Sequence, residues 1–329
     1  MNVFLTGASG LLGSHVARDL LLQNYSITAL KRPHSDFSLI SDVSPRVNWI
    51  EGNVFDINLL EYIIAQVDYV IHCAAIVSFS PNDKTAMYKT NVEGTQNIVN
   101  AIINTGCKAQ LIHISSVAAL GRKQNSKVID EENVWENSPH NTHYAITKYL
   151  SELEVWRGIE EGLQAVILNP SLIIGPGNWN GGSTKIFKYV YDEKPFYPAG
   201  TVNYIDVRDV VTTINFFLKT KFTNDRYIVS ADSVDYKKLF DTIAFYFKKK
   251  PPRIKTNSFI NELAWRVEYI RSLITGSTPI VSKETANISK LSVHFKNDKI
   301  KKLSGINFKT LNESVEWTCK NLMERYCQH

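Results

Sequence analysis

The sequence lacks several features that would place it in a specialised class of proteins. It has only four cysteines, Cys73, Cys107, Cys319 and Cys327, and their spacing is not that of metal ligands. Secreted disulfide scaffolds look different, so a reducing compartment is expected. No segment approaches the ~20 continuous apolar residues of a membrane span. The first residues also lack the basic and apolar regions of a signal peptide. We therefore expect a soluble cytoplasmic protein with no bound metal.

A strong charge of one sign is missing as well. The chain has 37 Lys and Arg residues against 32 Asp and Glu, a net charge of +5, and the two signs are mixed along most of the sequence. No face or tail is basic enough to require a nucleic acid. With 329 residues, 44% of them hydrophobic, the chain can bury a sizeable core. We expect its partner to be a small-molecule substrate, with no nucleic acid and no membrane involved.

Short apolar runs alternate with helical patterns in the first half of the chain. Their alternation indicates right-handed βαβ units and a parallel sheet that is covered on both faces. The predicted fold class is α/β, a doubly wound parallel sheet (Rossmann fold) with a smaller mixed α/β region at the C-terminal end. Strands are expected at 2–5, 26–30, 47–50, 68–72, 110–114 and 166–168, and helices at 11–24, 83–105 and 144–161.

The pattern loosens after about residue 176. Gly, Pro, Asn and Trp cluster at 175–182, and 194–200 is interpreted as loop. Further helices are expected at 206–219, 236–247, 258–273 and 312–323. The apolar stripe of the helix at 258–273 indicates packing against its own domain rather than membrane contact. The predicted division is a first domain at 1–175, to which strands return around 202–230, and a second region at 176–329.

A glycine-rich turn, Thr-Gly-Ala-Ser-Gly-Leu-Leu-Gly at 6–13, separates the first strand from the first helix. Glycine permits a tight turn, a close approach of backbone to a pyrophosphate, and close packing of helix on strand. The N-terminus of the following helix presents free amides and a partial positive charge to phosphates. In this strand–turn–helix context the run predicts a dinucleotide-binding site, so 1–175 is expected to bind the cofactor and 176–329 the substrate.

The end of the second strand bears on which dinucleotide binds. An enzyme that prefers NAD usually has an acid there, which accepts a hydrogen bond from the ribose hydroxyl. This chain has Lys31 and Arg32 instead. A cation cannot accept that bond, but a guanidinium pairs with a 2′-phosphate in two-pronged geometry. Arg32, helped by Lys31, therefore predicts NADP(H); the alternative is a pair of solvated surface cations.

Tyr144 and Lys148 stand four residues apart, on one face of a predicted helix. A free tyrosine, with a pKa of about 10, is a poor base at neutral pH, and a nearby ammonium favours the phenolate. The pair predicts proton transfer at a substrate oxygen while hydride moves to or from a nicotinamide. Ser115 or Ser116, at the end of the fifth strand, is expected to donate a hydrogen bond to that oxygen.

These residues resemble the extended short-chain dehydrogenase/reductase superfamily (the NAD-dependent epimerase/dehydratase family), whose opening reads TGxxGxxG. The resemblance covers nearly the whole chain. It is closest to the dihydroflavonol 4-reductase-like and 3β-hydroxysteroid dehydrogenase-like branch, on the run at 115–121, Asp130-Glu131 and the block at 202–209. Counted back from Gly121, the family's register implies that Ser116 is the catalytic hydroxyl.

The resemblance also implies how the cofactor is held. Asn53 stands where an Asp commonly holds the adenine amino group, Asn91 is expected to steady the active-site backbone, and His72 is expected to be structural. The implied cofactor-binding residues are Gly7, Ser9, Gly10, Leu11, Gly13, Lys31, Arg32, Asn53, Val54, Ala74, Ala75, Asn91, Lys148, Pro170 and Ser171.

The leading functional hypothesis is an NADP(H)-dependent oxidoreductase that reduces a carbonyl, or oxidises the matching alcohol, of a small apolar or phenolic substrate, with Tyr144 as acid/base. One alternative is a nucleotide-sugar epimerase or dehydratase with no net redox change. Such enzymes often carry an Arg just before the aromatic at Tyr204, where this chain has Val202 and Asn203. A second alternative is a non-enzymatic NADP(H)-sensing regulator, which would not need Tyr, Lys and Ser together. A homodimer through the Tyr144 helix and its predecessor is expected by analogy with relatives.

Overall fold

The computed structural model describes residues 1–122, 127–256, 284 and 289–326. Its centre is a parallel sheet of seven strands in the order β11-β7-β5-β4-β1-β2-β3. The strands are short and largely apolar, as expected of strands buried on both faces. Their bounds are β1 (Asn2–Thr6), β2 (Ser26–Lys31), β3 (Asn48–Glu51), β4 (Tyr69–His72), β5 (Gln110–Ile114), β7 (Ala165–Pro170) and β11 (Asp225–Val229). The predicted doubly wound α/β fold is confirmed.

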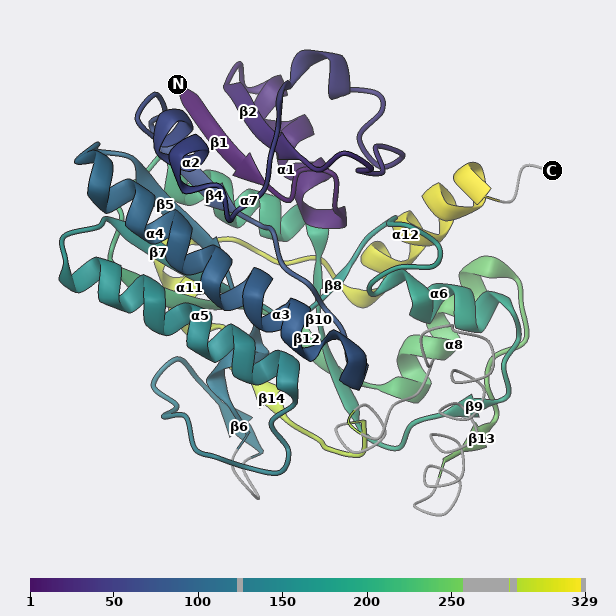
Figure 1. Cartoon of the computed structure of the whole chain (residues 1–329). Coiled ribbons are helices and arrows are strands. Elements are labelled where there is room, and N and C mark those ends of the chain that lie inside the picture. The colour runs from purple at the N-terminus through teal and green to yellow at the C-terminus, as the bar shows by residue number, and fades with distance from the viewer. Residues whose placement is uncertain (123–126, 257–283, 285–288, 327–329) are drawn as a thin grey trace.

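Helices cover both faces of this sheet (Figure 1). On one face α1 (Leu11–Leu22) and α7 (Val207–Leu218) pack against each other and, with α11 (Asp298–Ser304), against the strands. On the other face lie α2 (Ile57–Ile64), α4 (Gly94–Thr105) and α5 (His143–Glu160), which share a second apolar cluster with the strands. In sheets of this kind, ligands bind beyond the carboxyl ends of the strands.

The helix predicted at 83–105 is built from four pieces. A 3-10 turn η2 (Pro81–Asp83), the helix α3 (Lys84–Tyr88), a π-helical turn η3 (Lys89–Glu93) and α4 follow one another without a break. A π turn inserts one extra residue into the helix and is often found at functional sites. Here it carries Asn91 into the interior, where the side chain is 1% exposed.

Most of the remaining elements form a smaller region beside the large sheet, on the right of Figure 1. A three-stranded sheet in the order β12-β10-β8 shares an apolar cluster with three helices. The strands are β8 (Leu172–Ile174), β10 (Thr201–Asp206) and β12 (Asp232–Asp235), and the helices are α6 (Thr184–Tyr191), α8 (Tyr236–Phe247) and α12 (Leu311–Tyr326). The chain returns to the large sheet through β11, whereas the strand expected near 202 belongs to this small sheet.

Two short pairings tie distant segments together. The stretch 194–200, predicted as loop, contains β9 (Phe196–Tyr197), which pairs with β13 (Ile254–Lys255). β6 (Val128–Ile129) pairs with β14 (His294–Phe295). The helix predicted at 258–273 lies outside the described residues. No helix in the described part of the chain is both long enough and apolar enough to cross a membrane.

Candidate active site

The glycine-rich turn is tightly built. Gly7 has φ +70°, and a Cβ there would lie 2.8 Å from the backbone N of Ala74. A Cβ on Gly13 would lie 2.1 Å from the Gly7 carbonyl oxygen, and the Gly10 N–H donates to that same oxygen at 3.0 Å. Only glycine fits such positions without moving the backbone. The turn therefore packs directly against the loop after β4.

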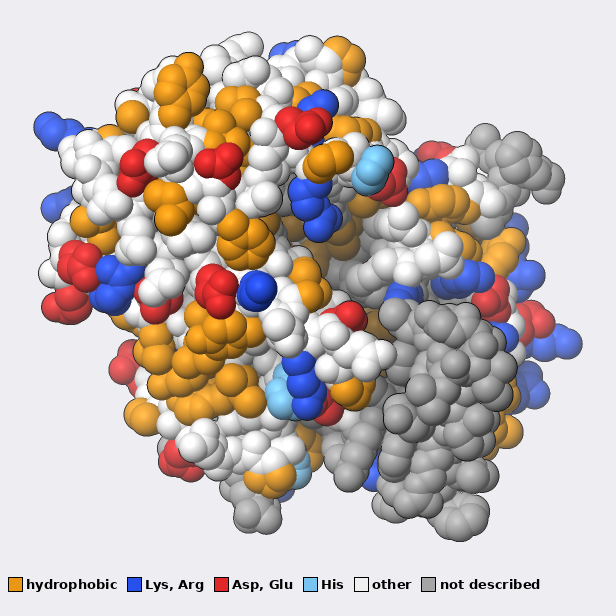
Figure 2. Space-filling view, viewed as in Figure 1, with side chains coloured by type: hydrophobic (Ala, Val, Ile, Leu, Met, Phe, Trp, Pro, Cys, Tyr) orange, Lys and Arg blue, Asp and Glu red, His pale blue; other side chains and the backbone are white. Residues whose placement is uncertain are grey.

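The turn ends in an anion-binding geometry. Gly10 is the N-cap of α1 and no side chain caps the helix, so its first amides are free for a ligand. Ser9 is partly exposed beside them, and Leu11 begins the helix. The surface is hollowed in front of the N-terminal end of α1, between the large-sheet half and the part that holds α6 and α12 (Figure 2). These features fit the pyrophosphate of a dinucleotide.

The loop after β4 is held by buried side chains. His72 contacts Thr6 Oγ1 through Nδ1 at 2.7 Å and Thr95 Oγ1 through Nε2 at 3.1 Å, and burial lowers its pKa to about 3. Both ring nitrogens are therefore satisfied, in agreement with the structural role expected for His72. The backbone N–H of Ala74 donates to Thr6 Oγ1 at 3.1 Å. Ala74 and Ala75 follow the strand end, beside the glycine turn.

Asn91 joins the loop after β4 to α5. Its Oδ1 accepts from the Ile76 N–H at 2.8 Å, and its Nδ2 donates to the Ile76 carbonyl at 2.9 Å and to Thr147 Oγ1 at 3.0 Å. Thr147 lies between Tyr144 and Lys148 on α5. The contacts are those of a residue that steadies the active-site backbone, the role the resemblance implies for Asn91.

Tyr144 and Ser116 meet at the open end of the sheet. Thr142 caps α5 by accepting from the Ala145 N–H at 3.1 Å, which sets Tyr144 in the first turn of the helix. Ser116 lies two residues after β5, and its hydroxyl lies close enough to the Tyr144 phenol to oppose the rise in the pKa of that phenol. Burial raises the pKa of Tyr144 to about 12. The phenol is therefore protonated at neutral pH and can give a proton to a substrate oxygen.

Lys148 lies one helical turn further along α5, with 2% of its surface exposed. Its Nζ donates to the Ile114 carbonyl at 2.8 Å, and burial lowers its pKa to about 8. The sequence predicts that this ammonium lowers the pKa of Tyr144. In the structure the Tyr144 pKa is raised instead, because burial outweighs every other influence on the phenol.

The two neighbouring serines have different surroundings. The Ser115 hydroxyl donates to Oε1 of Glu152, a buried carboxylate on α5, while the Ser116 hydroxyl faces Tyr144. This difference favours Ser116 as the hydroxyl that meets a substrate. Its catalytic role stays a prediction.

The residues expected around the adenosine end lie at the far edge of the sheet. The Arg32 side chain is exposed and makes no ion pair within the described residues, whereas Lys31 faces Glu51 at 3.9 Å. Asn53 Oδ1 already accepts from the Phe55 N–H at 2.8 Å, so the adenine contact would use its remaining lone pair. Val54 is buried against Gly94.

The end of β7 supplies the last predicted contacts. Pro170 closes this strand, and Ser171 is 7% exposed with a hydroxyl that has no hydrogen-bond partner among the described residues. A buried polar group without a partner is costly, so it signals a ligand or an unseen water. Ser171 thus fits the cofactor contact that the resemblance implies for it.

Three side chains near the site were not identified from the sequence. The Phe79 ring lies 6.2 Å from that of Tyr144, edge to face, in the loop after β4. Glu152 and Arg226 lie behind Lys148, with 3.6 Å between Oε2 and Nη1. The spacing of four residues between Lys148 and Glu152 was the only available signal, because it places both on one helix face.

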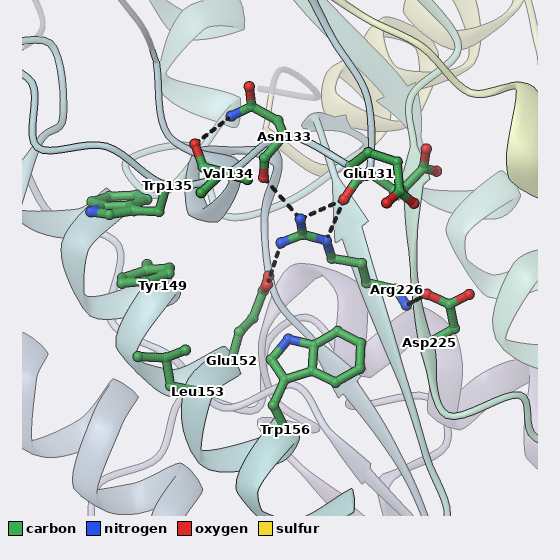
Figure 3. Close-up of a pocket in the computed structure, with 11 residues that line it drawn as sticks. Glu131, Asn133, Val134, Trp135, Tyr149, Glu152, Leu153, Trp156, Asp225 and Arg226 are labelled. Carbon is green, nitrogen blue, oxygen red and sulfur yellow. Dashed lines mark hydrogen bonds and ion pairs between the residues drawn. The ribbon is translucent and has the colours of Figure 1, made fainter.

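A pocket of about 380 Å³ opens behind α5. The stacked rings of Trp135 and Tyr149, with centroids 4.3 Å apart, stand above Leu153 on one side of it, and Arg226 with Glu152 forms its polar part (Figure 3). Neither Tyr144 nor Ser116 lines it. This pocket is therefore separate from the strand-end site.

The glycine-rich turn at 6–13 lies at the end of β1, and Tyr144, Lys148 and Ser116 lie on α5 and just after β5. Together they define a pyridine-nucleotide enzyme of the extended short-chain dehydrogenase/reductase type. Residues 3–230 match the NAD dependent epimerase/dehydratase family, and the chain belongs to that family.

Two named proteins and one solved structure are similar to this chain. It is 31% identical to a Synechocystis protein named dihydroflavonol 4-reductase, over 70% of this chain and 68% of that protein. It is 24% identical to cinnamoyl-CoA reductase 2 of Arabidopsis thaliana, over 98% of this chain and 92% of that protein. The UDP-glucose 4-epimerase structure from Thermotoga maritima has a TM-score of 0.80 at 18% identity and covers 98% of this chain and 99% of that one. That last likeness concerns the fold alone.

Proposed function

We propose that this protein is an NADP(H)-dependent reductase that converts a carbonyl of a small, apolar or phenolic substrate to the alcohol. The observation that carries the proposal is the proximity of the Tyr144 and Ser116 side chains to each other, on the elements that carry buried Lys148 and follow β5. A phenol, a hydroxyl and an ammonium in this order are what proton transfer to a substrate oxygen requires.

The residues divide the work in a simple way. Bound NADP(H) would supply the hydride. Ser116 donates a hydrogen bond to the substrate oxygen and so holds it against Tyr144, which gives up its phenolic proton. The Tyr144 pKa of about 12 keeps the phenol protonated at neutral pH, which is the form that a proton donor needs. Lys148, with its ammonium beside the Ile114 carbonyl, is the residue to hold the ribose hydroxyls.

Arg32 supports NADP(H) over NAD(H). Its guanidinium is exposed at the end of β2 with no ion-pair partner among the described residues, so it is available to a 2′-phosphate. Lys31 is partly engaged by Glu51 at 3.9 Å and is expected to add less. The end of β2 has Lys31 and Arg32 and no acid that would accept a hydrogen bond from a ribose hydroxyl.

The substrate class is supported by the site and by the relatives. Phe79 presents an aromatic ring at the catalytic phenol, which favours an apolar or aromatic substrate. Relatives named dihydroflavonol 4-reductase and cinnamoyl-CoA reductase act, by their names, on aromatic carbonyl compounds. A carbonyl attached to a phenolic or cinnamoyl framework is therefore the first class to try.

The sugar-nucleotide alternative has less support. Asn203 stands near the place where epimerases often carry an arginine for the diphosphate, and its side chain is used within the protein. Its Nδ2 donates to the Val293 carbonyl at 2.6 Å, and its Oδ1 accepts from the Phe295 N–H at 3.2 Å. The Asn203 side chain thus uses both its nitrogen and its oxygen to hold the small sheet to the segment around β14.

The test is a stoichiometric assay. NADPH, then NADH, is offered with aldehydes, ketones, dihydroflavonols, cinnamoyl-CoA thioesters and keto-sugar nucleotides, and both nicotinamide absorbance and product are followed. We expect one alcohol for each NADPH consumed with an aldehyde or ketone, and one aldehyde with one free CoA for each NADPH consumed with a thioester. Conversion of a sugar nucleotide without loss of NADPH would establish the epimerase alternative, and tight NADPH binding without any conversion would indicate a sensor.

We also propose a homodimer through α5 and α4. Ile146 and Leu153, which lie seven residues apart on α5, are 37% and 43% exposed, and Val134 nearby is 68% exposed. Apolar side chains gather on the surface over α5 and the loop beside it, at the lower left of Figure 2. Sedimentation of the wild type and of Leu153→Glu tests this: a dimer that dissociates in the variant supports it, and a wild-type monomer contradicts it.

A further inference from the structure

Glu152 is a carboxylate in an unusual place. It lies on α5 one turn beyond Lys148, and the two side chains are 1% and 2% exposed. Removing a carboxylate from water is costly unless it is paired and hydrogen bonded. Burial accordingly raises the pKa of Glu152. Two buried, oppositely charged groups at this spacing act on each other in a low-dielectric interior.

Three donors converge on the Glu152 carboxylate. The Ser115 hydroxyl and Asn169 Nδ2 both donate to Oε1, the latter at 2.5 Å. On the other side Arg226 Nη1 lies 3.6 Å from Oε2 (Figure 3). Oε2 has no hydrogen bond within the described residues, so the arginine is its main source of compensation.

Arg226 is itself held in place from the pocket side. Its Nε donates to the Glu131 carbonyl at 2.8 Å, and its Nη2 donates to the Asn133 carbonyl at 3.0 Å, as Figure 3 shows. The guanidinium is thus fixed by backbone oxygens of one loop and faces Glu152 with its remaining nitrogen. Its position depends on packing between β11 and that loop, not on Glu152 alone.

The carboxylate also reaches the catalytic serine. Asn169 Nδ2, which donates to Glu152, donates as well to the carbonyl of Ser116 at 2.9 Å. Ser115, the other donor, precedes Ser116 and binds β7 through its N–H to the Leu168 carbonyl at 2.8 Å. Glu152 therefore joins the ends of β5 and β7 directly behind the hydroxyl that faces Tyr144.

The charges around Lys148 come from several elements. Glu152 on α5 raises the pKa of Lys148, as does Cys73 after β4, while burial lowers it. His72 on β4 and His113 on β5 also face the ammonium, and burial lowers the pKa of both rings so that they are neutral. Glu152 is thus the first of the groups that oppose the loss of the Lys148 charge.

We propose that Glu152 is a positioning residue of this site: it fixes the strand end that carries Ser116 and keeps Lys148 charged at neutral pH, with Arg226 holding Glu152 ionised from the pocket side. This rests on the proposed function, because Lys148 and Ser116 matter only if the site is catalytic. A purely structural Glu152 would need its hydrogen bonds but not its charge.

Glu152→Gln separates the two requirements. A glutamine oxygen can accept from Ser115 and Asn169, but the negative charge beside Lys148 is gone. Because the Glu152 carboxylate favours the charged ammonium, its loss should lower the Lys148 pKa from its value of about 8, by an amount on the order of one unit. NADPH affinity and kcat both fall at alkaline pH when Lys148 loses its proton. In Glu152→Gln the midpoint of this fall should lie about one pH unit below that of the wild type.

Two variants of α5 complete the experiment. Glu154→Gln is the matched control, because Glu154 pairs with Arg157 at 3.0 Å on the outer side of the helix; its alkaline midpoint should equal that of the wild type. Glu152→Asp restores the charge on a shorter side chain, so its midpoint should return toward the wild type while kcat falls more than KM changes.

The outcomes are distinct. An unshifted midpoint in folded Glu152→Gln, or a shift that Glu152→Asp does not restore, overturns the proposal. If Glu152→Gln does not fold, Glu152→Asp carries the test alone, and a midpoint a full unit below the wild type contradicts it. NADPH binding is read separately from turnover. If the wild type reduces no carbonyl compound, the proposed function fails, while the binding midpoints still decide the role of Glu152.

Discussion

The large parallel sheet and the smaller C-terminal region are built in different ways. In the large sheet, β1 is linked to β2 through α1 and β3 to β4 through α2, and the candidate catalytic residues lie on α5 and just after β5. In the smaller region, β6 pairs with β14, the Gly200 N–H donates to the Ser289 carbonyl, and Arg325 reaches the Pro176 carbonyl. The candidate catalytic residues therefore lie on consecutive elements of the chain, whereas the smaller region depends on contacts between distant segments.

This difference predicts that chemistry and cofactor binding can be altered separately from the smaller region. The largest effect is expected at the catalytic phenol. Tyr144→Phe removes the proton donor, and loss of a general acid lowers kcat by about 10²–10⁴-fold. NADPH affinity should be nearly unchanged. The measurement is steady-state turnover with NADPH binding by fluorescence.

Tyr149→Phe is the matched control for Tyr144→Phe, since Tyr149 stacks on Trp135 outside the strand-end site. It should keep kcat. Equal loss in both variants would show that the helix, and not the Tyr144 phenol, is being perturbed.

The second effect concerns the core of the smaller region. Phe187 on α6 is 2% exposed, within the cluster shared by α6, α8 and α12. Phe187→Ala leaves a cavity and should lower the free energy of unfolding by about 3–5 kcal/mol. NADPH affinity of the folded variant should remain that of the wild type. Denaturant unfolding followed by tryptophan fluorescence, together with NADPH titration, checks both.

Phe245→Ala serves as the control for Phe187→Ala, because Phe245 on α8 is 75% exposed. Its effect on stability should be small. If Phe187→Ala also weakened NADPH binding strongly, the two regions would be coupled and the comparison above would be wrong.

The third effect concerns the choice of cofactor. Arg32→Asp replaces the exposed guanidinium at the end of β2 with an acid. Hydrogen bonds to charged groups contribute about 1.5–3 kcal/mol, so NADPH affinity should fall by about 10- to 100-fold. NADH affinity should not fall. The dissociation constants of the variant for NADPH and NADH test this expectation. An equal loss of affinity for both cofactors would show that Arg32 does not bind the 2′-phosphate.

The smallest effect is expected at Lys31. Its ion pair with Glu51, at 3.9 Å, is on the surface, and exposed pairs contribute about 0.2–1 kcal/mol. Lys31→Ala should therefore weaken NADPH by less than about fivefold, given such energies. NADPH titration of Lys31→Ala and of Arg32→Asp checks which of the two substitutions weakens binding more. A larger loss than that of Arg32→Asp would make Lys31 the phosphate ligand.

The sequence predicted the large sheet well because its signals are local. The strand at 110–114 has the predicted bounds, and the glycine turn lies between β1 and α1. The two-residue strand β9 was missed because its partner β13 is distant in sequence. The π turn that buries Asn91 leaves no pattern in residue spacing either, because it depends on the loop that Asn91 binds.

The candidate site was predicted in part for the same reason. Helical spacing places Tyr144 and Lys148 on one face, but it cannot show that burial raises the pKa of Tyr144. The choice between Ser115 and Ser116 depended on the family register, and the structure shows them facing Glu152 and Tyr144 respectively. Glu152 escaped notice because its environment depends on Arg226, from a strand far along the chain.

The most direct test of a reductase centred on Tyr144 is the transfer of label from NADPH. NADPH carrying deuterium at both hydrogens of the nicotinamide C4 is mixed with a dihydroflavonol or cinnamaldehyde-type carbonyl compound, and the alcohol is analysed by mass spectrometry for the wild type and Tyr144→Phe. The account predicts one deuterium in each alcohol formed by the wild type, and product formation at least about 100-fold slower in the variant. Label that stays on the nicotinamide while substrate is converted, or equal rates in the two proteins, would contradict it.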